Sequence, residues 1–304
     1  MIAVPDAVAK LAAALGEGPA AKLAASALVE ADALGLPRFG ITMLDEWSAD
    51  VAPLPATNEL QAISWRDCSA CFAPLAVASA TLDLEAAARQ SGLATVFLRG
   101  VRGFGRLAPF VRHLADAGLV GLAGAEGPPF VAPHGGTKAV IGTNPLAIAM
   151  GRGEERVVID VASSSATMAD IRTARAAGRP LPDGIALDGD GRSTSVAAEV
   201  AALLPRGGQV GSLLGLIVEL MAGVAGGGRG DPKGRGVFLL AFDPAAAGES
   251  IDWQAKLAGL KSDWTTGGGH WPRGGGLSAE ATLDADFTQR LDAYLARMTS
   301  RGSR

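Results

Sequence analysis

The sequence predicts an α/β protein built around a mixed β-sheet. Between residues 82 and 123, segments with helical spacing of apolar residues alternate with short runs rich in β-forming residues. Two further β-rich runs, residues 146–150 and 156–160, are separated by five residues that include two glycines, which predicts an antiparallel hairpin. Alternating helices and strands together with a hairpin indicate a sheet whose strands run in both directions.

Composition favours a globular protein that handles small molecules. Of its 304 residues, 48% are hydrophobic and 19% are charged, so the chain can bury a sizeable core. The 27 basic residues nearly balance 31 acidic residues, and no basic run occurs, so we expect neither nucleic acid nor membrane as a partner. Residues 1–6 lack the basic and apolar segments of a secretory signal, which predicts a cytoplasmic location.

The first 34 residues predict two alanine-rich helices. Val8, Leu11 and Leu15 recur at helical spacing in the first helix, and residues 16–19 break the pattern before the second. Residues 51–55 contain two prolines and predict an extended connector, because proline restrains its own backbone and that of the preceding residue. We place a soft domain boundary there.

The rest of the chain predicts further helices and strands. Helices are expected over residues 82–90 and 107–117, and strands over residues 94–98, 119–123 and 237–242, the last after a flexible loop at 226–236. The most apolar stretch, residues 212–224, contains Glu219 and is shorter than the roughly 20 residues of a membrane span, so it predicts a buried helix. A final helix is expected from about residue 278 to residue 297. We expect its apolar stripe to pack on the amino-terminal helices or on a second subunit; the stripe consists of Leu283, Phe287, Leu291 and Leu295.

Neither the cysteines nor an acidic turn predicts a metal site. Cys68 and Cys71 have the spacing of a redox pair or of half a zinc site, but the three histidines are scattered along the chain. We favour the interpretation of two small buried thiols. Residues 188–191, Asp-Gly-Asp-Gly, lack the further acidic positions of an EF-hand loop and predict a hairpin turn.

The usual nucleotide-binding fingerprints are absent from the sequence. It contains neither GxGxxG nor GxxxxGK[ST]. The loop of Gly100, Gly103 and Gly105 follows a predicted strand and precedes a predicted helix, where it could seat an anion at the helix amino terminus. Its glycine order differs from both fingerprints, so this loop alone leaves the ligand open.

The segment 131–149 carries a more specific signal. It contains Ala-Pro-His-Gly-Gly at 132–136 and Gly-Thr-Asn-Pro at 142–145, and is followed by Asp-Val-Ala-Ser at 160–163, Leu-Pro-Asp-Gly at 181–184 and Leu-Pro-Arg-Gly-Gly at 204–208. In this order the motifs resemble the type-2 malate/lactate dehydrogenase family, which includes ureidoglycolate, sulfolactate and cyclic imino-acid oxidoreductases. The resemblance runs from about residue 30 to about residue 276.

The resemblance implies a fold distinct from the Rossmann fold, like that of sulfolactate dehydrogenases. It implies a helical domain built from both chain ends, residues 1–55 and 275–304, and an α/β substrate-side domain of residues 56–118 and 245–274. Residues 119–244 would form the domain that binds NADH or NADPH. The family also implies a homodimer with sites near the subunit interface.

Cofactor contacts are expected on four segments that the resemblance brings together. Gly142 permits close backbone approach, and Pro145 favours an extended Asn144, so that Thr143 and Asn144 offer polar groups to a pocket. By resemblance the cofactor contacts fall on Thr143, Asn144, Asp160, Val161, Ala162, Gly207, Gly208 and Arg273.

Four polar groups of the family pattern are missing. Phe39 stands where relatives carry a proton-donating histidine, Gly103 stands at a second histidine, and Val210 replaces a lysine. An arginine that anchors a substrate carboxylate shortly after the first histidine is also missing. Candidate substitutes for the anchor are Arg38, Arg102 and Arg106, with Arg38 beside the lost histidine. His134 is the one histidine near the expected pocket and the best spare acid. We therefore name His134 and Arg38 as candidate catalytic residues.

These observations support two hypotheses about function. The first is an NAD(P)H-dependent oxidoreductase that reduces a small carboxylate-bearing cyclic imine or 2-oxo acid, or oxidises a 2-hydroxy acid in reverse. Reduction of a protonated imine does not need the missing proton donors, because the imine already carries its positive charge and accepts hydride directly. The second is a catalytically silent or repurposed ligand-binding homologue. Binding of NADH or NADPH separates the two.

Overall fold

A six-stranded mixed sheet forms the centre of the molecule. The computed structural model describes residues 1–46, 61–231, 234–248, 252–274, 276–278 and 280–301, so the expected connector at 51–55 lies outside the described residues. Within them the strand order is β2 (Ile63–Asp67), β3 (Leu93–Val101), β9 (Arg235–Phe242), β4 (Val120–Ala125), β5 (Leu146–Met150) and β6 (Val157–Val161). β2 and β3 are parallel, and every other neighbouring pair is antiparallel. The predicted α/β class with a mixed sheet is confirmed.

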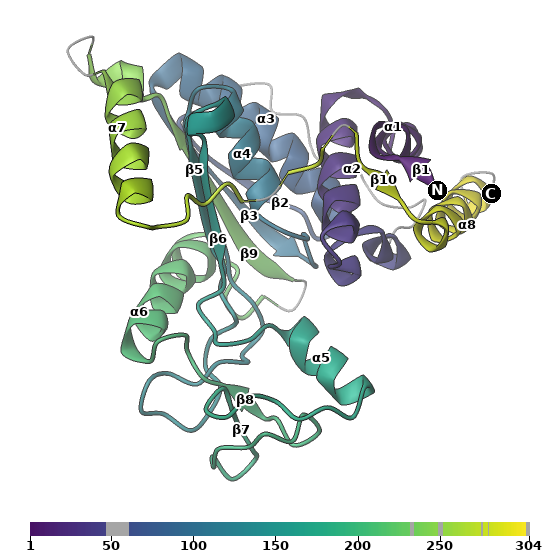
Figure 1. Cartoon of the computed structure of the whole chain (residues 1–304), viewed down its shortest axis with the longest axis vertical. Coiled ribbons are helices and arrows are strands. Elements are labelled where there is room, and N and C mark those ends of the chain that lie inside the picture. The colour runs from purple at the N-terminus through teal and green to yellow at the C-terminus, as the bar shows by residue number, and fades with distance from the viewer. Residues whose placement is uncertain (47–60, 232–233, 249–251, 275, 279, 302–304) are drawn as a thin grey trace.

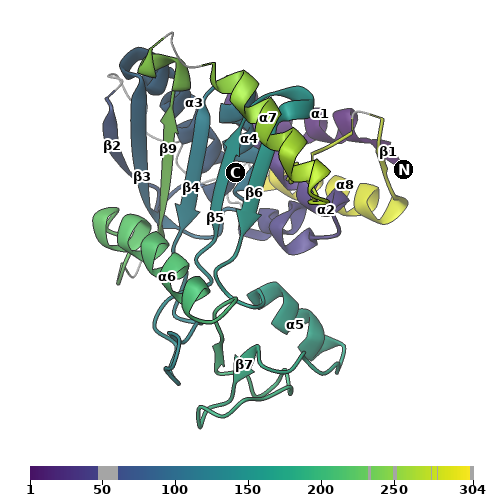
Figure 2. The same cartoon turned by 60° about the vertical axis from the view of Figure 1, so that its left-hand side comes forward.

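Helices cover one face of this sheet. Figure 2 shows the strands in order from β2 to β6 with α3 (Ala73–Ser91) and α4 (Ala108–Asp116) behind them. Side chains alternate along β5 and β6, so that Ala147, Ala149 and Val158 are buried on the helix side while Ile148 and Ile159 remain exposed on the other. α3 starts nine residues before the predicted helix, with Pro74 in its first turn.

The two ends of the chain pack together, as Figure 1 shows on its right-hand side. α1 (Val4–Ala14), α2 (Gly18–Ala33) and α8 (Ala285–Arg301) form this layer, and the short strands β1 (Ile2–Ala3) and β10 (Thr282–Leu283) pair beside it. Phe287 and Leu291 are buried in the same core cluster as Leu11, which confirms that the last helix packs on the amino-terminal helices. The helix begins later than predicted, because Leu283 belongs to β10.

A smaller lobe hangs below the sheet (Figure 1). It contains α5 (Met168–Ala176), β7 (Ala186–Leu187) and β8 (Ala202–Leu203), and has its own core cluster with Val131, Ile171 and Leu203. The predicted hairpin turn at 188–191 is confirmed, because the Asp188 carboxylate accepts the backbone N–H groups of Asp190 and Arg192, both at 2.9 Å.

A helix is present over residues 212–224, as predicted, but the prediction that it is buried is wrong. The segment forms α6 (Gln209–Val218) and continues as the π-helical turn η4 (Glu219–Ala225). One face, with Gly211, Gly215 and Val218, is buried, but the opposite face is exposed and also apolar. A helix that is apolar all round normally predicts burial on every side, and here the fold of this chain covers only one side. Within the described residues, no helix is long and apolar enough to cross a membrane.

α7 (Trp253–Thr266) was not expected from the sequence. It packs on the β5–β6 hairpin, where Leu257 lies against Gly151 and the Lys261 ammonium donates to the Glu154 carbonyl at 2.7 Å. An added Cβ at Gly151 would meet the Leu257 side chain at 2.5 Å, so the glycine permits this close packing.

Candidate functional site

One edge of the sheet gathers loops from distant parts of the sequence. The antiparallel register places the carboxyl ends of β3, β4 and β6 beside the amino ends of β9 and β5. The loops 102–107, 126–145 and 162–167 leave the sheet at this edge, and residues 226–231 lie before β9, which begins there. In Figure 2, α6 lies across the same lower end of the strands. We therefore take this edge as the candidate site.

Three of the expected cofactor segments meet there. The Thr143 carbonyl accepts hydrogen bonds from the backbone N–H and the hydroxyl of Ser163, at 3.0 and 2.9 Å. The Ser163 carbonyl in turn accepts the Arg206 N–H at 2.8 Å. Backbone hydrogen bonds thus connect the Thr143 segment, the end of β6 and the turn of Gly207 and Gly208.

Small residues let α6 approach this point closely. An added Cβ at Gly215 would meet the Ser163 hydroxyl at 2.8 Å, so only glycine permits the contact. Gly207 and Gly208 have φ values of +63° and +64°, in the left-handed region that favours glycine. The backbone N–H groups of the first turn of α6 therefore lie directly after the turn, where they have no partner within the helix.

His134 lies at the amino end of α6. Its backbone N–H donates to the Ser212 hydroxyl at 3.1 Å, and its ring is 3.3 Å from the position that a Cβ on Gly208 would take. The side chain is exposed. The structure thus groups His134 with the Gly207 turn, although 73 residues separate His134 from Gly207 in sequence.

Both the nitrogen and the oxygen of the Asn144 side-chain amide form hydrogen bonds within the protein. Its Nδ2 donates to the Gly215 carbonyl and to the Glu219 carboxylate, both at 2.9 Å, and its Oδ1 accepts the Gly127 N–H at 3.0 Å. The expectation of an extended Asn144 is wrong, since its φ is +36°. Asparagine tolerates this left-handed conformation better than most residues, and the three hydrogen bonds of its amide, two of them buried, offset its cost.

Two buried glutamates lie beside Asn144. Glu219, at the start of η4, also pairs with Arg229, and Glu126 accepts the Gly236 N–H at 3.1 Å. Burial raises the pKa of Glu126, and the nearby Glu219 charge adds to that rise. Glu126 was not expected from the sequence as a polar group of this edge. Its position directly after the apolar strand β4 was the available signal.

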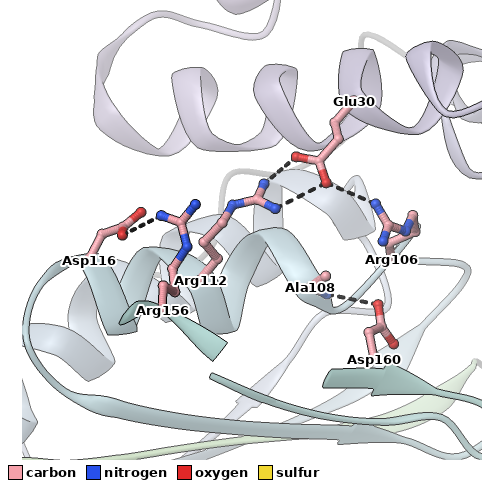
Figure 3. A network of polar contacts seen from close by, with 7 residues as sticks. All are labelled: Glu30, Arg106, Ala108, Arg112, Asp116, Arg156 and Asp160. Carbon is pink, nitrogen blue, oxygen red and sulfur yellow. Dashed lines mark hydrogen bonds and ion pairs between the residues drawn. The ribbon is translucent and has the colours of Figure 1, made fainter. Parts of the chain in front are cut away.

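A second polar network joins the helical layer to the sheet (Figure 3). Glu30 of α2 is fully buried and accepts hydrogen bonds from Arg106 at 2.8 Å and from Arg112. Asp160 of β6 accepts the Ala108 N–H at 2.9 Å, at the start of α4. Burial raises the pKa of Asp160, while the Ala108 hydrogen bond and the Arg106 charge oppose the rise. The Asp160 carboxylate is therefore directed to the helix side of the sheet.

Phe39 and the Gly103 loop lie next to each other. Phe39 belongs to the short 3-10 helix η1 (Pro37–Phe39), and Met43 to the following turn η2 (Ile41–Glu46). The Phe39 carbonyl lies 3.2 Å from an added Cβ on Gly105, and the Met43 methyl lies 3.4 Å from one on Gly103. The two positions that lack the expected histidines therefore lie at one contact, between the segment of η1 and η2 and the Gly103 loop. We call this contact the Phe39 junction.

Asp32 holds the Phe39 side of this junction in place. Its carboxylate accepts the Ile41 N–H at 2.7 Å and pairs with Arg290 of α8 at 3.0 Å. A Cβ on Gly40 would overlap this carboxylate, so glycine is required there. Both ends of the chain thus fix the segment that carries Phe39.

The predicted catalytic and cofactor residues do not all come together. Arg38 is exposed next to Phe39, whereas His134 lies with α6, and no hydrogen bond between described residues joins the two. Arg273 pairs with Glu154 at 2.5 Å, at the opposite end of β6 from Val161. Arg106 is committed to Glu30.

The cysteines and histidines outside the edge form no recognisable metal site. Burial raises the pKa of the Cys68 thiol to about 12 and raises that of Cys71 in the same direction. His113 contacts the Glu85 carboxylate at 2.9 Å. In the part of the chain that the structure describes, no three His, Cys, Asp or Glu side chains are placed to hold a metal ion.

Comparison with known sequences gives a consistent set of relatives. A family model described as malate/L-lactate dehydrogenase matches residues 7–265. The chain is 36% identical to a Δ1-pyrroline-2-carboxylate/Δ1-piperideine-2-carboxylate reductase of Pseudomonas putida, over 64% of this chain and 58% of that protein. It is 35% identical to a (2R)-3-sulfolactate dehydrogenase (NADP(+)) of Chromohalobacter salexigens, over 74% of each. A ureidoglycolate dehydrogenase (NAD(+)) of Escherichia coli K12 is 31% identical over 75% of this chain and 66% of that protein.

Solved structures share the fold over almost the whole chain. A Δ1-piperideine-2-carboxylate reductase from Pseudomonas syringae superposes with a TM-score of 0.75 and 27% identity, covering 99% of this chain and 95% of that one. Sulfolactate dehydrogenase from Methanocaldococcus jannaschii has a TM-score of 0.77 at 20% identity, covering 98% of each chain, and is evidence for the fold alone. The mixed-sheet fold expected from the resemblance is thereby confirmed.

Proposed function

The chain belongs to the malate/L-lactate dehydrogenase family, and on this premise we propose that it is an NAD(P)H-dependent reductase of a small cyclic imine bearing a carboxylate. Its relatives include cyclic imino-acid reductases, a sulfolactate dehydrogenase named for NADP(+) and a ureidoglycolate dehydrogenase named for NAD(+). A 2-oxo acid, or a 2-hydroxy acid in reverse, is the next candidate substrate. The observation that carries the proposal is the meeting of Thr143, Ser163 and the Gly207 turn at one sheet edge.

This edge fits a phosphate-bearing cofactor. A Cβ on Gly207 would meet no atom within 4 Å, so the turn is open on its outer side. The N–H groups and the dipole at the amino terminus of α6 favour an anion, and the exposed Arg206 adds positive charge. We propose that Thr143, Val161, Ala162, Gly207 and Gly208 hold the cofactor by backbone contacts. Bound NADH or NADPH supplies the hydride.

The Phe39 junction supports an imine over a ketone. Neither Phe39 nor Gly103 can donate a proton, and a positioned proton donor is worth about a hundredfold to ten-thousandfold in rate. A protonated imine needs no such donor, because hydride addition to its carbon neutralises the charge and leaves an amine. We propose that Arg38, exposed beside Phe39, pairs with the substrate carboxylate.

The proposed role of the other site residues follows from their positions. His134, beside Gly208, is the proposed proton donor if a 2-oxo acid is the substrate. Asn144 and Asp160 support the cofactor segments through the hydrogen bonds of their side chains to the protein. Arg273 remains a proposed cofactor contact only if its pair with Glu154 opens.

A silent or repurposed binding homologue is the alternative. Two observations favour it. Arg106 pairs with Glu30, which removes one substitute for the arginine that anchors a substrate carboxylate in relatives, and Arg38 lies apart from His134. In this case the pocket would bind a ligand without reducing it.

Assembly, location and domain division complete the proposal. We propose a homodimer in the cytoplasm. We also propose the three-part division into residues 1–55 with 275–304, residues 56–118 with 245–274, and residues 119–244, the last part binding the cofactor.

Cofactor binding is the first test. Purified protein is titrated with NADH and with NADPH while cofactor fluorescence and thermal stability are recorded, because a ligand of the folded state raises apparent stability. Binding of either, followed by reduction of a five- or six-membered cyclic imine carboxylate, supports the reductase. Folded protein that binds neither cofactor at millimolar concentration supports the silent homologue.

The Phe39 junction has a separate test. Phe39→His restores a proton donor and should raise the reduction of 2-oxo acids by about a hundredfold, while Phe39→Leu, the matched control, should not. Imine reduction should be retained by both variants. Native protein that reduces 2-oxo acids as fast as imines would refute the preference for imines.

A further inference from the structure

The outer face of α6 and η4 carries a regular apolar stripe. Its members follow one another at spacings of three and four residues, and each is between 51% and 75% exposed; they are Val210, Leu213, Ile217, Leu220 and Val224. We call this set the α6 stripe. Within α6, where Val210, Leu213 and Ile217 lie, spacings of three and four are those of a helix that packs lengthwise on another helix.

The solvent-facing side of α6 is apolar. The buried side, with Gly211, Gly215 and Val218, already packs on this chain, so the stripe is a second apolar face. From residue 207 to residue 224 the only charged residue is Glu219, and its side chain is buried. A helix with apolar residues on both sides needs a partner for the uncovered one.

An apolar strip of the sheet is exposed on the face opposite α3 and α4. Ile148 pairs with Ile159, and Leu146 pairs with Val161, so four apolar side chains line up across β5 and β6. Ile148, Ile159 and Val161 are 38% to 41% exposed. In Figure 2 this face looks towards the viewer, as α6 does.

The exposed area matches what a stable dimer needs. Five aliphatic side chains that are each at least half exposed present on the order of 500 Å² of apolar surface, which reaches the upper range of patches on monomers. The β5–β6 strip adds to it. A standard interface buries about 800 Å² on each partner, so the stripe and the strip together reach that scale.

We propose that the α6 stripe packs on the α6 stripe of a second copy of this chain, around a twofold axis near Ile217. This refines the homodimer proposed above by assigning its surface. A stripe of one residue class is complementary to itself, as a twofold interface requires. A helix that lies on a lipid surface is typically rich in Lys and Arg on its polar side, and residues 207–224 contain neither.

The test measures oligomeric state in the full chain. Light scattering or sedimentation should give a dimer for the native protein and a monomer for the double variant Leu213→Lys/Leu220→Lys. Leu260→Lys, at a similarly exposed leucine of α7, is the matched control and should remain dimeric. Circular dichroism establishes that each variant is folded.

A cysteine variant tests the axis without adding charge. Ile217→Cys should form a disulfide between two copies under mild oxidation with diamide, because the two copies of a residue at the twofold axis face each other. Leu260→Cys and the native protein, which contains Cys68 and Cys71, should not cross-link.

The outcomes separate the two proposals. A monomeric native protein overturns both the homodimer and the packing of one α6 stripe on the other. Binding of that monomer to anionic phospholipid vesicles would identify a lipid surface as the partner of the stripe instead. If the dimer survives the lysine substitutions, or if dimeric Ile217→Cys does not cross-link, the packing of one α6 stripe on the other is overturned while the homodimer stands. Cofactor titration of the same samples tests the reductase independently.

Discussion

Replacing Asn144 with alanine should destabilise the fold more than any change at an exposed site residue. The substitution removes three hydrogen bonds, two of them buried, so that the Gly127 N–H and one Glu219 oxygen lose their present partner, while the Gly215 carbonyl keeps the Glu219 N–H. It also puts alanine at a φ of +36°, which asparagine tolerates better.

The expected loss follows from these contacts. Each buried group left unsatisfied costs about 1–3 kcal/mol, and the left-handed backbone adds about 1 kcal/mol, but partial relaxation reduces the sum. We expect Asn144→Ala to lower the free energy of unfolding by about 4 kcal/mol. For a domain of this size, each kcal/mol shifts Tm by about 2–4 °C, so Tm should fall by roughly 10 °C.

Urea denaturation followed by tryptophan fluorescence measures this loss, and circular dichroism gives the Tm. Asn144→Gly is the matched control, because it removes the same hydrogen bonds but accepts a positive φ, and it should be about 1 kcal/mol more stable than Asn144→Ala. If Asn144→Ala kept its stability within 1 kcal/mol and lost cofactor binding, the amide would serve a ligand and our account of its structural role would be refuted.

Two further predictions concern buried acids. Glu30→Gln removes the buried carboxylate charge that pairs with Arg106 and Arg112 and should cost about 3–5 kcal/mol in urea denaturation, whereas the exposed Glu17→Gln should cost little; equal stability of the two variants would contradict the role of the network. The folded-state pKa of Glu126 is raised above its ordinary value of 4.5, so its contribution to stability is present below that pH and is lost as pH rises through the folded pKa. Glu126→Gln should therefore flatten the decline of stability above pH 4.5, and an unchanged pH profile would argue against a buried, raised carboxyl.

Much of the sheet and part of the site were predictable from local patterns. β4, β5, β6 and β9 were expected within one or two residues of their ends, because short apolar runs bounded by turns are local signals. β2 was missed because Ile63 and Trp65 face solvent at the sheet edge while Arg66 is buried, which inverts the usual pattern. The resemblance predicted that the Thr143 segment and the Gly207 turn would belong to one site, and the structure brings them together.

The sequence by itself determined the mixed-sheet class, since short helical and β-rich runs are local signals, and its ordered motifs indicated the family and the segments of the candidate site. Tertiary structure alone decided that Glu30 meets Arg106 and Arg112, 76 and 82 residues away, and that the Asn144 amide turns inward to Glu219. It also decided which face of α6 is covered. An apolar helix has the same local sequence whether its outer side meets its own chain or another, and only the packing of the remaining elements distinguishes the two.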